Sequence, residues 1–154
     1  MKKGLTFAIL MFCPFLVLEA ANPKAEDEVF EMNGIWIGQP LRDARERLPS
    51  LNCENSCIAD NQYFMKKPGR LWAGLKDGKI DQLAFRFRPV LADGAIDEVR
   101  SSIIKKYGEP SGNLGFRNCD EWKAHGGFLV LCLTDEVSHA MWSNESRMDA
   151  NSGR

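Results

Sequence analysis

The sequence lacks an excess of charge of either sign. Its 154 residues contain 20 lysines and arginines against 21 aspartates and glutamates, for a net charge of -1. A dedicated nucleic-acid-binding protein needs a basic face to neutralise phosphates, so this balance argues against that class. The hydrophobic content of 44% and the charged content of 27% are typical of one soluble globular domain, and they exclude a mostly disordered chain.

Histidines and catalytic motifs are also scarce. Only two histidines occur, His125 and His139, which limits acid–base chemistry near neutral pH. The sequence contains no G-x-S-x-G nucleophile elbow, no phosphate-binding glycine loop, no H-E-x-x-H pair and no calcium-binding loop. We therefore expect a non-enzymatic protein that needs no cofactor and no metal. The alternative is a small envelope hydrolase in which His139, beside Ser138, acts as the base.

One long apolar run occurs, near the start of the chain, from Leu5 to Leu18. Two lysines precede this run and Glu19-Ala20-Ala21 follows it, which is the pattern of a secretory signal peptide. The run is shorter than the roughly 20 residues of a membrane-spanning helix. We expect residues 1–21 to be a signal peptide cleaved after Ala20 or Ala21. The mature protein is then expected to be periplasmic or secreted, without stable membrane insertion.

Export would leave four cysteines in an oxidising compartment: Cys53, Cys57, Cys119 and Cys132. Two strand-like runs surround His125-Gly126, which suits a two-residue hairpin loop. In that register Cys119 faces Cys132 at a non-hydrogen-bonded pair, whose Cα atoms lie about 4.5 Å apart, within the range of a disulfide. The sequence therefore predicts the bridges Cys119–Cys132 and Cys53–Cys57. The alternative is a zinc site formed by all four thiolates.

Apolar spacing predicts two helices. Pro40 suits the start of a helix over residues 41–48. Asp93 is expected to cap a longer amphipathic helix over residues 95–107, which Gly108 ends.

Turn signals predict strands between and after these helices. Asp77-Gly78 is the strongest hairpin signal, because both central positions of a type I′ turn need a positive φ. Strands are expected on either side of it, with Trp72 opposite Leu83. The expected strands cover residues 34–38, 62–65, 71–76, 79–88 and 137–142 and two runs within 116–135, with a turn at 67–69. A short helix is the alternative for residues 137–142.

These elements predict an α+β fold for one domain over residues 29–145, with a flexible leader over residues 22–28 and a polar tail over residues 146–154. The expected architecture has two layers, with two helices packed on an antiparallel sheet of about five strands. Each half of the chain has a helix followed by a hairpin, which suggests a loose αββ pseudo-repeat.

One stretch combines the aromatic, methionine and basic side chains that supply contact area and orientation at protein interfaces. We expect it to bind a partner, and the alternative is an ordinary amphipathic strand. The expected partner is another envelope or secreted protein, and no nucleic acid. The chain would then be an inhibitor, an immunity protein or an envelope-assembly accessory protein. The stretch comprises Tyr63, Phe64, Met65, Lys66, Lys67 and Arg70, and Trp72 follows it.

Two segments resemble small bacterial envelope proteins. Residues 34–44 (GIWIGQPLRDA) and 104–110 (IKKYGEP), with Trp122 in the hairpin that follows, are similar to segments of the SmpA/OmlA outer-membrane assembly lipoproteins and to the helix–sheet halves of β-lactamase inhibitory proteins. The resemblance covers about a quarter of the chain and implies a helix-on-sheet interaction module, with no binding residue carried over. The chain departs from SmpA/OmlA in its four mature cysteines and in lacking a lipidation signal, because Cys13 lies inside the apolar run.

Peptide mapping without reductant tests the predicted pairing. We expect Cys119 joined to Cys132 and Cys53 joined to Cys57, with no free thiol in the native or the unfolded protein and no bound zinc. A peptide that joins Cys53 to Cys132 would refute the hairpin register. Bound zinc together with four titratable thiols would favour the metal site.

Overall fold

The computed structural model of the chain describes residues 29–54, 56–114, 119–124, 127–133 and 138–143. The expected signal peptide, leader and polar tail lie outside these ranges, as do the hairpin-loop residues His125 and Gly126.

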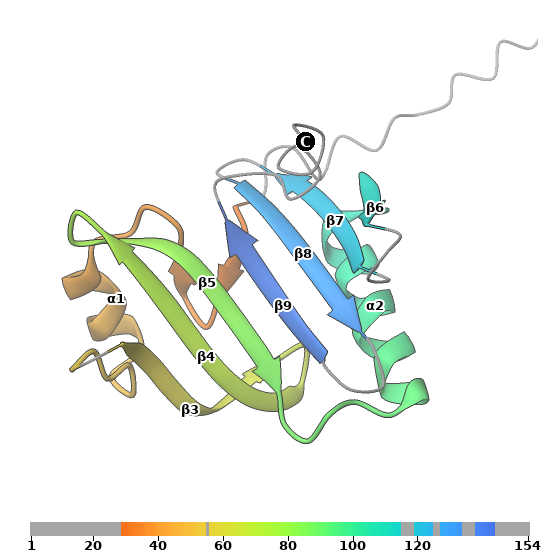
Figure 1. Ribbon diagram of the computed structural model, residues 1–154, viewed down its shortest axis with the longest axis horizontal. Helices are drawn as coiled ribbons and strands as arrows, with labels where there is room; N and C mark the ends of the chain where they lie inside the picture. Colours follow the sequence, from red (N-terminus) through yellow and green to blue (C-terminus); the bar gives the residue numbers. More distant parts are fainter. Residues whose placement is uncertain (1–28, 55, 115–118, 125–126, 134–137, 144–154) are drawn as a thin grey trace, which may run out of the picture.

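Most strands belong to one antiparallel sheet of seven, in the order β3-β4-β5-β9-β8-β7-β6 (Figure 1). Two meanders, β3–β4–β5 and β6–β7–β8–β9, meet where β5 pairs with β9. A separate two-stranded sheet pairs β1 with β2. The strands are β1 (Glu31–Met32), β2 (Ile35–Trp36), β3 (Cys57–Phe64), β4 (Lys67–Lys76), β5 (Lys79–Phe87), β6 (Gly112–Leu114), β7 (Cys119–Ala124), β8 (Gly127–Leu133) and β9 (Ser138–Ser143).

The predicted fold class, two helices on a sheet of about five strands, is wrong. Of the residues that the structure describes, 52% are in strands and 21% in helices, and the main sheet has seven strands. The described part of the chain is therefore mostly β. Strand β6 and the pairing of β1 with β2 could not be found from the sequence, because segments of two or three residues are too short to show a period of two. The main sheet combines a three-stranded meander, β3–β4–β5, with a four-stranded one, β6–β7–β8–β9, and neither is the single hairpin of an αββ unit.

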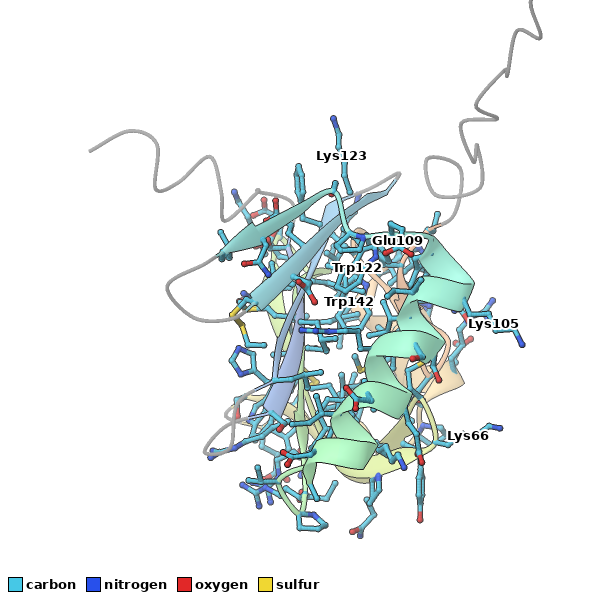
Figure 2. The ribbon with its side chains drawn as sticks, turned by 90° about the vertical axis from the view of Figure 1, so that its right-hand side faces the viewer. Lys66, Lys105, Glu109, Trp122, Lys123 and Trp142 are labelled. Atoms are coloured by element: carbon cyan, nitrogen blue, oxygen red, sulfur yellow. A yellow bond between two sulfur atoms is a disulfide. The ribbon has the colours of Figure 1, made fainter. Side chains whose placement is uncertain are left out.

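Helices α1 (Leu41–Arg47) and α2 (Asp93–Tyr107) lie on one side of the main sheet, and no described helix or strand covers the other side (Figure 2). Trp122 and Trp142 lie between the sheet and α2 and are almost fully buried. One apolar core joins the sheet to both helices and to β1 and β2. Leu83, Phe85 and Phe87 of β5 and Val99, Ile103 and Tyr107 of α2 are buried in this core.

The helix ends are largely as predicted. Helix α1 follows Pro40, and α2 ends at Gly108, whose φ of 84° is in the left-handed region. The predicted cap at Asp93 is wrong, because Asp93 is already the first residue of α2 and Ala92 precedes it without a side-chain cap. A backbone hydrogen bond of 3.0 Å from Leu41 to the oxygen of Gly78 ties the start of α1 to the β4–β5 turn.

Two tight turns connect the first meander. Asp77-Gly78 joins β4 to β5 as predicted, with φ values of 52° and 72°. The turn between β3 and β4 is Met65-Lys66, with φ values of 47° and 64°, and not the predicted 67–69, which already belongs to β4. Side chains such as methionine and lysine rarely adopt a positive φ, so no turn signal marked this position.

A register shift between Gly74 and Leu75 leaves Asp81 of β5 as an extra residue and changes which residues of β4 and β5 face each other. A bulge of one residue moves a side chain to the opposite face of a sheet. As a result Trp72 faces Ala84, and not Leu83 as predicted. Trp72 therefore lies on the side of the sheet opposite to the core.

Both predicted disulfides are confirmed, and together they use the four thiols that a zinc site would need. Cys119 on β7 faces Cys132 on β8 with Cα atoms 4.2 Å apart, in the predicted hairpin register. Cys53 and Cys57 close a short loop before β3, with Cα atoms 3.9 Å apart.

The loop at the smaller disulfide runs along the outer side of β3, which is an edge strand. Asn52 and Ile58 exchange two backbone hydrogen bonds of 2.9 and 2.7 Å there. The side chain of Gln62 also donates to the hydroxyl of Ser50 at 3.2 Å. Residues 50–52 therefore cover part of the edge of β3.

Gly69 on β4 has no room for a side chain, and this gives a test of the packing. A Cβ atom there would lie 2.3 Å from the carbonyl oxygen of Arg86 and 2.5 Å from Cε1 of Phe85. We expect Gly69→Ala to lower the free energy of unfolding by about 1–3 kcal/mol, because the ring or the backbone must move. Gly94 in α2 has nothing within 4 Å of an added Cβ, so Gly94→Ala should be neutral or stabilising by about 0.5–1 kcal/mol. Urea unfolding of both variants measures the difference, and equal effects would contradict this packing.

Candidate functional site

The uncovered side of the main sheet carries apolar side chains in a line across five adjacent strands. Successive residues of a strand point to opposite faces, so these side chains alternate with the core residues beside them. Four of them are partly exposed, and the fifth, Val130, is buried. This apolar row comprises Ile58, Trp72, Ala84, Met141 and Val130.

A basic row lies next to the apolar row on the same side of the sheet. It comprises Arg70, Arg86 and His139, where Arg70 faces Arg86 and Arg86 faces His139 across neighbouring strands. Arg86 is exposed, and the other two side chains are partly exposed. The next residue across the sheet is Cys132, which is bridged to Cys119. The disulfide therefore crosslinks two strands of the surface beside this row.

Contacts between the two rows hold Trp72 and Arg70 in place. The guanidinium of Arg70 lies over the indole of Trp72, with Cζ 5.5 Å from the ring centroid. The same guanidinium forms an ion pair with Asp60 on β3. A cation over an aromatic ring is attracted by the ring quadrupole. In the apolar row the amide of Gln82 contacts the sulfur of Met141 at 3.1 Å. A surface with fixed side chains loses less entropy when it binds a partner.

A shallow polar hollow of about 460 Å³ adjoins these rows at the edge of the sheet. Two carboxylates, Glu54 and Asp60, give it acidic character next to Arg70. Within the described residues, no three histidine, cysteine, aspartate or glutamate side chains are grouped so that they could hold a metal ion. The hollow is lined by Ser50, Asn52, Glu54, Ser56, Ile58, Asp60 and Arg70.

The residues predicted to bind a partner do not form one surface. Tyr63 is 62% exposed, whereas Phe64 is 6% exposed and its ring lies 5.3 Å from that of Trp142 in the core. Met65 packs against the core, and Lys66 lies on the helix side of the sheet (Figure 2).

The two remaining predicted residues are held by ion pairs. Lys67 pairs with Glu98 of α2, and Arg70 pairs with Asp60. Adjacent residues of a strand point to opposite faces, so Tyr63 points away from the core that Phe64 enters. Tyr63 and Arg70 are therefore the members of the predicted stretch that lie on the uncovered side.

The arrangement around His139 does not assemble the hydrolytic pair that Ser138-His139 suggested. Ser138 is 1% exposed and faces the core side, because adjacent residues of a strand point in opposite directions. The cross-strand neighbours of His139 are Arg86 and Cys132, a cation and a bridged sulfur. Neither neighbour can serve as a nucleophile for a histidine base.

No protein family, curated protein or solved structure matches this chain. The resemblance to SmpA/OmlA and β-lactamase inhibitory proteins therefore stays a prediction. In the ranges that the structure describes, no helix is long and apolar enough to cross a membrane.

Arg86 and Met141 of this surface were not singled out from the sequence, whereas Trp72 follows the predicted binding stretch. Trp72 was assigned to the core face because the bulge was not foreseen. For Arg86 the sequence did contain a signal, because Arg86 alternates along β5 with the buried Phe85 and Phe87. That alternation shows that Arg86 points away from the core, but it does not show which residue of which strand lies beside it.

The ion pair between Lys67 and Glu98 gives a test that uses pH. The hydrogen bond from Lys67, and then its positive charge, hold the pKa of the Glu98 carboxyl below its ordinary value. A lowered folded-state pKa contributes stability above the unfolded pKa, and this contribution is lost as the pH falls through the folded pKa. We expect Lys67→Gln to raise the pKa of Glu98 toward its ordinary value in an NMR titration of the carboxyl carbon. Lys66→Gln is the matched control and should leave this pKa unchanged. A normal pKa of Glu98 in the unsubstituted protein would contradict the ion pair.

Proposed function

We propose that this chain is a non-enzymatic protein-binding module of the periplasm or the secreted space, and that it binds its partner through the uncovered side of the main sheet. The observation that carries the proposal is the apolar row beside the basic row on one uncovered face. The classes it suits are an inhibitor, an immunity protein and an envelope-assembly accessory protein.

The composition of this face supports binding to a protein. Tryptophan, methionine and arginine are enriched at protein interfaces, and tryptophan and arginine dominate the residues that contribute most to affinity. Trp72 is partly exposed and lies between Ile58 and Ala84 in the apolar row, where a partner can bury it further. The arginines beside it favour a partner that presents carboxylates around an apolar side chain, because opposite charges steer and orient association.

The rigidity of the scaffold also supports the proposal. Disulfides persist in oxidising compartments, which agrees with an exported protein. The bridge between Cys119 and Cys132 and the contacts of Arg70 fix the face before a partner arrives. A preorganised surface converts more of its contact energy into affinity.

Site-specific photocrosslinking in the exporting cell tests the proposal. A photoreactive residue at position 84, in the centre of the apolar row, should crosslink to a protein. The same residue at position 101, which is exposed on α2, should not give that product. The same product from both positions, or none from position 84, would refute binding through this face.

Two tryptophans provide a matched pair of variants for the crosslinked complex. Trp72 lies under Arg70 on the uncovered face, and Trp36 on β2 lies under Arg47, with Cζ 5.0 Å from its ring centroid. We expect Trp72→Ala to lower the crosslink yield and the affinity about tenfold or more, the effect of losing a central interface residue. Trp36→Ala should change both less than about twofold, because Trp36 lies away from this face. Circular dichroism and the thermal midpoint confirm that each variant is folded. Equal losses from the two variants would count against the proposed face.

A further inference from the structure

Two arginines face each other directly on the uncovered side of the sheet. Arg70 on β4 and Arg86 on β5 are register partners, and His139 lies on the far side of Arg86. Like charges directly opposite each other on neighbouring strands are destabilising. The chain as a whole has a net charge of -1, so this concentration of positive charge is local and is not part of a generally basic surface.

Among the described residues, a carboxylate pairs with Arg70 but none pairs with Arg86. Asp60 pairs with Arg70 from β3, on the side away from Arg86. Arg86 is exposed and forms no ion pair within the part of the chain that the structure describes, where the pairs are Arg42–Asp43, Lys67–Glu98, Arg70–Asp60 and Arg100–Asp120. Among the described residues, no carboxylate therefore neutralises the charge of Arg86.

The surroundings determine where such an anion would bind. On the β3 side of Arg70, Glu54 and Asp60 line the polar hollow, and they repel a second carboxylate. On the β5 side, Arg86 is the register partner of Arg70, and the next pair on the same face is Trp72 and Ala84 of the apolar row. A guanidinium presents a planar fork of N–H donors that matches a carboxylate, and two such groups can share its two oxygens.

We infer that Arg70 and Arg86 form a carboxylate-binding site that takes an acidic side chain of the protein partner. This inference rests on the proposed function and names the chemistry of the contact. A carboxylate flanked by apolar side chains fits better than a polyphosphate, because the apolar row lies directly beside the arginines. A polyphosphate would require the wider basic surface that the charge balance of this chain does not provide.

A model peptide tests the site without knowledge of the partner. The probe is a fluorescein-labelled peptide, Gly-Ser-Glu-Leu-Glu-Ser-Gly, measured against the full exported chain by anisotropy and by NMR of the arginine Nε–H groups. We expect saturable binding that shifts the resonances of Arg70 and Arg86, and we expect the peptide with glutamine in place of both glutamates not to bind. Arg86→Gln should weaken binding about tenfold, as expected for the loss of a charged hydrogen-bonding group.

A matched control removes one positive charge elsewhere. Lys105 lies on α2 and points away from the sheet (Figure 2), so Lys105→Gln should leave the peptide affinity unchanged. The thermal midpoint gives a second measurement. Arg86→Gln removes the repulsion with Arg70, so the midpoint should stay the same or rise, which a merely structural arginine would not show. A lowered midpoint, or equal weakening by both variants, would overturn the inference.

Two further outcomes would also overturn the carboxylate site. Tighter binding to phosphatidylglycerol vesicles, or to inorganic phosphate, than to the peptide would indicate a phosphate site. An absence of peptide binding, while the crosslink at position 84 still forms and depends on Trp72, would refute the carboxylate site and leave the proposed function standing. If the peptide does not bind and the crosslink at position 84 does not form, both the carboxylate site and the proposed function are refuted.

Discussion

The pairing of β5 with β9 is the contact on which the rest of the structure depends. It joins two meanders that are formed by separate halves of the chain, and it is the only strand pairing between them in the described residues. On the core side its register places Leu83 beside Trp142. On the other side the same register places Arg86 beside His139. One set of backbone hydrogen bonds therefore fixes the centre of the core and the centre of the candidate site together.

Local features of the fold could be predicted from the sequence, and long-range features could not. The Asp77-Gly78 turn and the pairing of Cys119 with Cys132 follow from loop chemistry and from counting residues outward from a loop. The pairing of β5 with β9 has no such local signal, because the two strands are joined only after α2 and three other strands. For the same reason the predicted fold class was wrong. A strand of three residues such as β6 forms because it pairs with a neighbouring strand, and its own sequence shows no strand pattern.

The candidate site was partly predicted for a similar reason. Alternation along one strand shows which residues share a face, and it separates Arg86 from Phe85 correctly. It cannot foresee a bulge, and the bulge of the β4–β5 hairpin places Trp72 on the uncovered face and not on the core face. Tyr63 and Arg70 belong to the predicted stretch and lie on the uncovered side, whereas Phe64 belongs to the core. Proximity in the sequence is therefore a poor guide to a binding surface made of register partners.

The loop at Cys53 and Cys57 has a consequence for how molecules of this protein meet one another. An edge strand with free N–H and C=O groups can pair with the same strand of another molecule and begin an aggregate. Residues 50–52 occupy part of that edge at β3, and the opposite edge, β6, is only three residues long. A disulfide that closes so short a loop adds less to the stability of the fold than one that closes a long loop. The loop that it closes occupies hydrogen-bonding positions of β3 that a strand of a second molecule would otherwise take.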